Sequence, residues 1–285
     1  GLAPIILTAT GAGTSAGLTA SASGNVLGGP TATGNITVNA DIIDWGASLM
    51  TLQSSGSLLI QPRTPTTTIG IGNSAAGTLN LTAAELGGIQ DGFSEITIGN
   101  GTAGNITVNA ATFSDPLRLI TGGTLAINGA FNTGANRLAL IVGGNTSQTA
   151  ALTAGSLRLG GNGNFTLLNA SNNIATLSKN GTGSLAYMDA DSVAIGTVDG
   201  INGLVGSSVE VRANTNITAT ATSITTTGGT IILNSDRDAT GGGNIQLTGT
   251  TITSNGGAIT LGGGANPLTT AATGISSSSP VTRAG

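Results

Sequence analysis

A short pattern recurs along the whole chain and limits the folds open to it. Two apolar residues flank one residue of another kind, and small residues usually border the triplet. Because the side chains of an extended strand point alternately to opposite faces, both apolar residues share one face and the middle residue lies on the other. Each copy therefore predicts a short, half-buried β-strand. The clearest copies are NITVN (35–39), TLNLT (78–82), EITIG (95–99), NITVN (105–109), TLAIN (124–128), SLRLG (156–160), SVEVR (208–212), NIQLT (244–248) and AITLG (258–262).

The repeats are related to one another and evenly spread. The heptapeptide GNITVNA occurs at 34–40 and again at 104–110, which indicates internal duplication. Several successive copies begin about 13 to 22 residues apart, a spacing of short strands that is typical of sandwiches, propellers and solenoids.

Composition favours the solenoid. Aromatic residues make up only 2% of the chain, whereas a sandwich or propeller core usually contains more large side chains, and 48 glycines are available for corners. We therefore predict an all-β fold, a right-handed parallel β-helix (β-solenoid), with about 14 coils of roughly 20 residues. One repeat region is expected over residues 1–285. The chain begins with Gly1 and its first methionine is Met50, so we expect a segment of a longer polypeptide.

One stretch has helical rather than strand character. Thr82 and Glu85 have the spacing of a capping box, and Leu86 and Ile89 follow on one helical face. This predicts a short helical excursion near residues 82–88, with an irregular loop as the alternative. The prolines in Asp115-Pro116 and in residues 61–65 predict turns or loops that leave the stack.

Charge and hydropathy exclude two classes of partner. The net charge is −4 and the eight Lys and Arg residues form no basic stripe, so nucleic acid is not expected to bind. Apolar runs are interrupted every few positions by Gly, Ser, Thr or Asn, and none approaches the ~20 residues of a membrane-spanning helix. We expect no membrane span.

Missing residue types restrict the chemistry. The chain has neither Cys nor His, which excludes disulfides, thiolate zinc sites, cysteine nucleophiles and histidine-based triads. We predict that the protein is not an enzyme, that it has no catalytic, cofactor-binding or metal-binding residues, and that it needs no cofactor.

Two carboxylate pairs are the candidates for catalytic chemistry. Asp189 with Asp191 and Asp236 with Asp238 are i, i+2 pairs, which on a strand share one face about 7 Å apart, a geometry compatible with glycan cleavage. Neither pair has aromatic residues nearby to stack on a sugar. We therefore interpret both as solvated turns.

Three other motifs resemble ligand sites without completing them. Asn234, Asp236 and Asp238 begin like a calcium loop, but Ala239 and Ile245 stand where such a loop needs Gly and Glu. The run from Gly160 begins like a calcium-binding nonapeptide, but Phe165 replaces the liganding Asp. Thr-rich stretches at 217–222 and 225–227 resemble the flat threonine array of ice-binding solenoids, but they are local, whereas ice binding needs one face to repeat along the solenoid. Nine asparagines lie in N-x-[ST] sequons, close to the roughly six expected by chance from this composition: Asn35, Asn80, Asn100, Asn105, Asn145, Asn164, Asn169, Asn180 and Asn216.

Longer phrases resemble the repeat region of filamentous haemagglutinin-like exoproteins, the bacterial two-partner-secretion adhesins. The phrases are TTIGIG (67–72), GTLNLTAAEL (77–86), QDGFSEITIG (90–99), LNSDRDA (233–239) and GGAITLG (256–262), within residues 40–265. The resemblance implies a right-handed β-helical shaft that projects from the bacterial cell surface.

These observations lead to one expected function and several alternatives. We expect a non-catalytic shaft segment of a secreted bacterial surface adhesin or exoprotein, located outside the cell, with possible contacts to cell surfaces or matrix. The alternative is a self-assembling extracellular filament or sheath subunit formed by end-to-end stacking, because uncapped solenoid ends expose strand edges. An ice-binding solenoid and a polysaccharide-active β-helix enzyme are weaker alternatives.

Overall fold

The fold consists of stacked parallel strands. The computed structural model describes residues 3–10, 17–272 and 274–277. Its strands are nearly all parallel and stack as a β-solenoid of about ten turns with almost no helix. The prediction of an all-β parallel β-helix is therefore confirmed, while its right-handed winding and the single repeat region over 1–285 stay predictions.

The prediction of 14 coils was wrong, because the coils are not uniformly about 20 residues long. Asn105 is linked by a hydrogen bond to Thr124, 19 residues further on, whereas Asn216 is linked in the same way to Asn244, 28 residues further on. The coil between strands that start at residues 57 and 95 also contains a helical insertion. Longer loops and this insertion add residues without adding coils.

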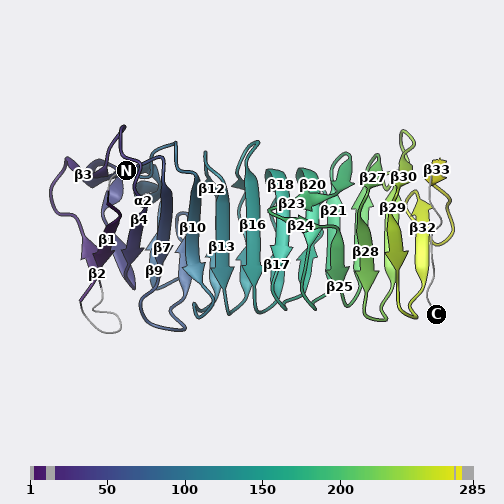
Figure 1. Cartoon of the computed structure of the whole chain (residues 1–285), viewed down its shortest axis with the longest axis horizontal. Coiled ribbons are helices and arrows are strands. Elements are labelled where there is room, and N and C mark those ends of the chain that lie inside the picture. The colour runs from purple at the N-terminus through teal and green to yellow at the C-terminus, as the bar shows by residue number, and fades with distance from the viewer. Residues whose placement is uncertain (1–2, 11–16, 273, 278–285) are drawn as a thin grey trace. The chain divides into compact units, whose positions relative to one another are not determined.

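The chain divides into two compact units, Gly1–Gly144 and Asn145–Gly285. In the first unit one face of the solenoid stacks six main strands, with a short pair beside them, and β10, β13 and β16 lie side by side (Figure 1). A second face stacks four strands, and two further pairs complete the first coils. The bounds are β1 (Ile5–Thr8), β4 (Ile36–Asn39), β7 (Ser57–Gln61), β10 (Glu95–Asn100), β13 (Leu117–Thr121) and β16 (Arg137–Val142); β12 (Ala111–Thr112) and β15 (Phe131–Asn132); β9 (Leu79–Leu81), β8 (Ile69–Ile71), β11 (Ile106–Val108) and β14 (Leu125–Ile127); β2 (Gly17–Thr19) with β5 (Ile42–Asp44), and β3 (Asn25–Gly28) with β6 (Met50–Gln53).

The second unit has the same plan. Three columns of parallel strands stack along it, and one antiparallel hairpin is inserted. The bounds are β18 (Leu152–Gly160), β20 (Asn173–Lys179), β22 (Val193–Ile195), β27 (Ile217–Thr220), β30 (Asn244–Thr248) and β33 (Gly274–Ser277); β25 (Leu204–Gly206), β28 (Ser223–Thr226) and β31 (Thr251–Thr253); β17 (Thr146–Gln148), β19 (Phe165–Leu167), β21 (Leu185–Asp189), β26 (Val209–Ala213), β29 (Ile231–Ser235) and β32 (Ile259–Gly263); and the hairpin β23 (Thr197–Val198) with β24 (Ile201–Asn202).

The core consists of aliphatic columns that run through successive coils. Val38 pairs with Ile60, Ile60 with Ile98, Ile98 with Leu119, and Leu119 with Leu140, and all five side chains have 0% exposure. The nine patterns in the sequence each contain a strand. Their two apolar residues are buried in every case except β32, where both are half-buried.

The predicted helical excursion is present. Helix α2 (Ala83–Gly87) begins at the N-cap Thr82, whose side chain and that of Glu85 form the expected capping box. A second short helix, α1 (Gly46–Leu49), was not predicted. The two helices pack against each other, and the fully buried Trp45 donates its indole N–H to the carbonyl oxygen of Glu85 at 3.4 Å. Neither described helix is long and apolar enough to cross a membrane.

Candidate functional site

The first carboxylate pair does not form the shared face that its spacing predicted. Asp189 ends β21 and its side chain is completely buried, whereas Asp191 lies past the end of the strand and is exposed. Asp189 accepts hydrogen bonds from the Tyr187 hydroxyl at 2.6 Å, from the backbone N–H of Ile174 at 3.1 Å and from that of Asp191 at 3.0 Å. The i, i+2 argument failed because the strand ends between the two residues. A substrate outside the solenoid has no access to the inner carboxylate.

The buried Asp189 links stability to pH. Burial raises its pKa to about 6, even though hydrogen bonds from Tyr187, Asp191 and Ile174 act in the opposite direction. Burial, together with the nearby Asp189 carboxylate, also raises the pKa of Tyr187 well above its usual value. Because its pKa is higher in the folded state than the value of about 3.9 in the unfolded state, protonated Asp189 favours the folded state. This stabilisation is complete below about pH 3.9 and is lost as the pH rises through about 6.

Asp189→Asn is therefore expected to remove part of the pH dependence of unfolding. The free energy of unfolding of the wild type, relative to the variant, should fall by about 2 to 3 kcal/mol between pH 4 and pH 7. Urea unfolding at intervals of one pH unit measures the difference. Asp238→Asn is the control, because it removes an exposed carboxylate from a different turn, the one that follows β29. If the difference in unfolding free energy between the wild type and Asp189→Asn stays constant or grows with pH, Asp189 does not have a raised pKa in the folded state.

The second carboxylate pair lies in a turn, as interpreted from the sequence. Asp236 and Ala239 have left-handed backbone conformations, with φ of 51° and 56°. Asp236 accepts the backbone N–H of Gly242 at 3.1 Å, and Asp238 accepts that of Thr240 at 3.2 Å. Among the described residues no three Asp, Glu, His or Cys side chains come together to hold a metal ion. These carboxylates therefore stabilise their own turn.

The nonapeptide-like run and the threonine-rich stretches are also ordinary parts of the solenoid. Phe165 begins β19 and is completely buried, so the run that precedes it is a corner of the solenoid. The outward-facing Thr218 pairs with Ala194 on the preceding coil and with Gln246 on the following coil, so threonine does not repeat along this face. Thr225 does pair with Thr253, but this threonine pair is local. The outer face of these coils is therefore mixed in composition.

Several sequon asparagines link one coil to the next. In five cases the side-chain carbonyl accepts a backbone N–H from the following coil, at the first residue of a strand or at the residue just before it. The pairs are Asn35 with Ser57 (2.9 Å), Asn105 with Thr124 (3.0 Å), Asn145 with Asn164 (3.3 Å), Asn164 with Ser184 (2.9 Å) and Asn216 with Asn244 (2.9 Å). In the N-x-[ST] pattern, the Asn side chain at the corner thus accepts a hydrogen bond from the next coil. The Ser or Thr two positions later lies in the strand and faces outward.

The single lysine of the chain lies inside the solenoid. Lys179 ends β20 in an aliphatic column, where it pairs with Leu159 on one side and Leu204 on the other, and its exposure is 0%. Its Nζ donates to the carbonyl oxygens of Gly183 at 2.7 Å, Val205 at 2.9 Å and Gly181 at 3.2 Å. An ammonium group has three N–H donors, so this carbonyl cage satisfies all of them.

The environment of Lys179 is otherwise apolar. Its Nζ lies 6.0 Å from the centre of the Phe165 ring, a cation–π distance. Burial lowers the pKa of Lys179 to about 8. Because the side chain is enclosed by the fold, we assign it a structural role at this corner rather than a nucleophilic one.

A buried amide has a comparable role near the start of the second unit. Asn172 has 0% exposure and donates to the carbonyl oxygens of Leu167 at 3.1 Å and Met188 at 3.2 Å. Its carbonyl oxygen accepts the backbone N–H of Leu152 at 2.9 Å, and its side chain also exchanges hydrogen bonds with Gln148. The amide therefore joins residues on several coils.

Two carboxylates in the first unit are held ionised by their neighbours. Burial acts to raise the pKa of Asp41, but hydrogen bonds from Thr64, Thr67 and the backbone of Arg63 outweigh it and lower the pKa. These bonds fix the proline-containing loop that the sequence predicted at residues 61–65.

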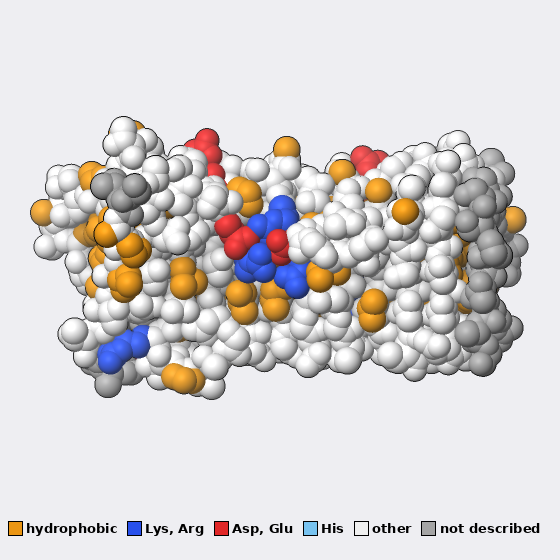
Figure 2. Space-filling model, in the orientation of Figure 1, with side chains coloured by type: hydrophobic (Ala, Val, Ile, Leu, Met, Phe, Trp, Pro, Cys, Tyr) orange, Lys and Arg blue, Asp and Glu red, His pale blue; other side chains and the backbone are white. Residues whose placement is uncertain are grey.

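The second of these carboxylates belongs to an ion-pair ladder on the outer face. Glu95 contacts Arg118 at 3.0 Å and also Arg137, on the two strands that follow. Burial acts to raise the pKa of Glu95, but the hydrogen bonds and charges of both guanidinium groups lower it overall. Elsewhere on the face shown in Figure 2, uncharged polar side chains and backbone predominate.

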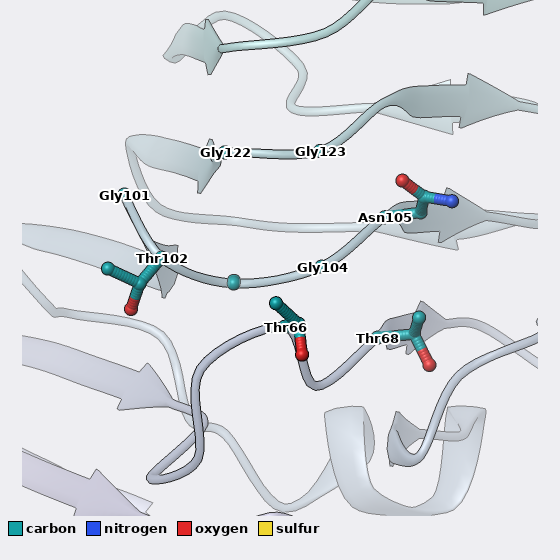
Figure 3. A pocket seen from close by; sticks show the side chains of 9 residues that line it. Thr66, Thr68, Gly101, Thr102, Gly104, Asn105, Gly122 and Gly123 are labelled. Carbon is teal, nitrogen blue, oxygen red and sulfur yellow. The ribbon is translucent and has the colours of Figure 1, made fainter.

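A shallow groove with a volume of about 450 Å³ lies in the first unit. Its floor is the backbone of Gly101, Gly104, Gly122 and Gly123, and the side chains of threonines and Asn105 lie around it (Figure 3). The glycines are needed because the coils approach closely: a Cβ at Gly104 would lie 2.2 Å from the carbonyl oxygen of Thr66. None of the lining side chains is acidic or basic, so the groove lacks a group for acid–base catalysis.

No protein-family model, curated protein or solved structure matches this chain. The roles described above therefore come from its own residues. Sequence reasoning missed Lys179 and Asn172, two buried polar side chains of the second unit that each have several hydrogen-bond partners. The burial of Lys179 could have been predicted from its position two residues after Leu177, because alternate residues of a strand face the same side and Leu177 faces inward.

Proposed function

We propose that this chain is a non-catalytic shaft segment of a secreted bacterial surface adhesin or exoprotein, positioned outside the cell. The observation that carries the proposal is the uninterrupted register of the aliphatic columns, such as the one through Ile60, Ile98 and Leu119, which have 0% exposure. Each additional coil in such a ladder extends it by about 4.8 Å while burying its own core. The resemblance in residues 40–265 supports the adhesin context.

The polar residues support the same proposal. The buried Asp41 and Lys179 have most or all of their hydrogen-bonding capacity satisfied within the fold. The outer face carries a mixture of threonine, small residues and a few ion pairs. This arrangement suits a segment that keeps its form between other regions, with any cell-surface or matrix contact made through weak polar interactions.

Force spectroscopy on the purified chain tests the shaft directly. A stack of coils should resist and then release one coil at a time, each freeing 18 to 38 residues, the spacing of partners on successive coils, or about 60 to 130 Å of extended chain. Val108→Asp is the comparison variant, because it should lower the force of the earliest events. Smooth lengthening at low force, with no stepwise events, would remove the mechanical role.

The location is tested separately. Antibodies raised against the purified chain are expected to label intact cells of the source organism without permeabilisation. Labelling that requires permeabilisation would contradict the surface assignment while leaving the mechanical role open to its own test.

A second candidate function is a filament or sheath subunit formed by end-to-end association. It is favoured by the way the coils pair: β7 binds β4 on one edge and β10 on the other, and coils of two copies would add to each other in the same parallel manner. Strands with an unpaired edge are templates for the addition of another strand.

A further inference from the structure

The Asp115–Pro116 peptide bond lies at a corner of the first unit, just before β13. Asp115 is 5% exposed, whereas Ser114 is exposed and Pro116 is half-buried. Asp115 is the one aspartate of the chain that is followed by proline. The nitrogen of an X–Pro bond belongs to a tertiary amide, and it accepts a proton more readily than other peptide nitrogens. Proline is therefore the best leaving group that a peptide bond offers to acid–base chemistry.

A second carboxyl group contacts Asp115 from the segment that leads into β10 on the preceding coil. The Asp115 side chain accepts the backbone N–H of Gly92 at 2.9 Å, and hydrogen bonds also join it to the backbone of Phe93 and to the side chain of Asp91. Two carboxyl groups bond to each other only when one of them is protonated, because two carboxylates repel. The pair therefore holds one proton.

The surroundings of the pair place this proton mainly on Asp115. Burial is the largest cause of the raised pKa of Asp115, and the hydrogen bond and charge of Asp91 act in the same direction. Asp91 itself is exposed. The strands packed around this corner carry three other charged residues, Glu95, Arg118 and Arg137, which pair with one another on the outer face. A neutral carboxyl group and a carboxylate thus lie in contact beside the bond to proline.

We propose that Asp91 and Asp115 cleave the Asp115–Pro116 bond, so that the chain processes itself at this corner. Asp91 takes the proton of the Asp115 carboxyl group while an oxygen of that group attacks the main-chain carbonyl carbon of the same residue. The new C–O bond closes a five-membered cyclic anhydride, so the attack needs only rotation about the side-chain bonds of Asp115. As the C–N bond breaks, Asp91 donates the proton to the nitrogen of Pro116.

Water completes the reaction. One water molecule hydrolyses the anhydride, which leaves Asp115 as a C-terminal residue with two carboxyl groups and Pro116 as a new N-terminus. The exposed Ser114 and the half-buried Pro116 leave the bond within reach of solvent. The net change is the hydrolysis of one peptide bond. The pair acts once, because its substrate is part of the same chain.

Cleavage at this corner nicks the solenoid without separating its parts. β13 follows the cut and pairs with β10, which precedes it, from Ile96 with Leu117 to Asn100 with Thr121. β12 and β15 also pair across the cut. The two fragments should therefore stay bound to each other in native solution and separate only on denaturation. The inference goes beyond the shaft and filament proposals and depends on neither.

Mass spectrometry of the denatured protein measures the cleavage. The purified chain is incubated between about pH 3 and pH 8, a range that spans the titration of carboxyl groups. We expect fragments 1–115 and 116–285, whose masses together equal that of the intact chain plus one water. The rate should be highest at mildly acidic pH, because protonation of both carboxyl groups removes the proton acceptor and ionisation of both removes the proton that Pro116 needs.

Variants separate this reaction from the ordinary acid lability of an Asp–Pro bond. Asp91→Asn should slow the cleavage by about 100-fold or more, the usual contribution of general acid–base catalysis. Pro116→Ala should also slow it strongly, because alanine is a poorer leaving group. Asp44→Asn is the matched control, since it removes an exposed carboxylate of β5 in the same unit and should leave the rate unchanged. Circular dichroism confirms that each variant is folded.

The folded state is compared with the wild type in urea, where the contact between Asp91 and Asp115 is lost. The folded chain should be cleaved faster than the unfolded chain at the same pH. The proposal is overturned if the folded wild type gives no fragments at any pH, if cleavage is as fast in urea or in Asp91→Asn as in the folded wild type, or if Asp44→Asn is slowed as much as Asp91→Asn.

Discussion

Val108→Asp is expected to destabilise the fold by about 4 kcal/mol or more, because it buries an unpaired carboxylate. Val108 has 0% exposure and pairs with Ile71 on one side and Ile127 on the other. A carboxylate at this position would lie in an aliphatic column without a hydrogen-bond donor. Ile106→Asp, one face position earlier, should behave in the same way.

Thr107→Asp is the matched control for this prediction. Thr107 lies between the two buried residues and is only partly buried, because its side chain points outward. The same change of residue should cost about 0.5 kcal/mol or less there. Thermal unfolding followed by circular dichroism separates the cases. Similar losses at 107 and 108 would show that the inward and outward faces have been assigned incorrectly.

Lys179→Met should cost about 3 kcal/mol or more in free energy of unfolding, because the variant keeps most of the aliphatic stem but removes the ammonium donor from three carbonyl oxygens. These are the oxygens of Gly181, Gly183 and Val205, at 2.7 to 3.2 Å from Nζ. The loss should be confined to the second unit. Urea unfolding gives the free energy, and hydrogen exchange of the amides around residues 181–206 locates it.

Arg212→Met provides the control for Lys179→Met. The Arg212 side chain is 35% exposed and pairs with Glu210 on the same strand, so its removal should cost less than about 1 kcal/mol. A loss for Lys179→Met no larger than this would mean that the carbonyl cage contributes little to stability.

The parallel strands and the capped helix could be predicted because each depends on local signals. Alternation in segments such as NITVN fixes which side chains point inward, and Ile106 and Val108 are indeed buried. The capping box depends on Thr82 and Glu85 alone. Neither required knowledge of which coil lies next to which.

Coil lengths and buried polar groups could not be predicted, because both depend on partners distant in sequence. The segment that contains α2 turns back, so β9 lies beside β8 on the side away from β11. No local pattern marks that return. Asp189 looked like a solvated turn residue, yet it is enclosed by Tyr187 and by the backbone of Ile174 from the preceding coil.

Pairwise spin-label distances along one outward column test the central claim, that successive coils stack in parallel register. Thr166, Ala186, Glu210, Ile232 and Thr260 pair in this order through β19, β21, β26, β29 and β32. The chain has no native cysteine, so cysteines introduced at chosen pairs can be labelled selectively. Label pairs at 166 with 210, 166 with 232 and 166 with 260 should lie at about 10, 14 and 19 Å, before allowance for the linker, rising by about 4.8 Å per coil. Distances that do not increase in this order would contradict the parallel solenoid.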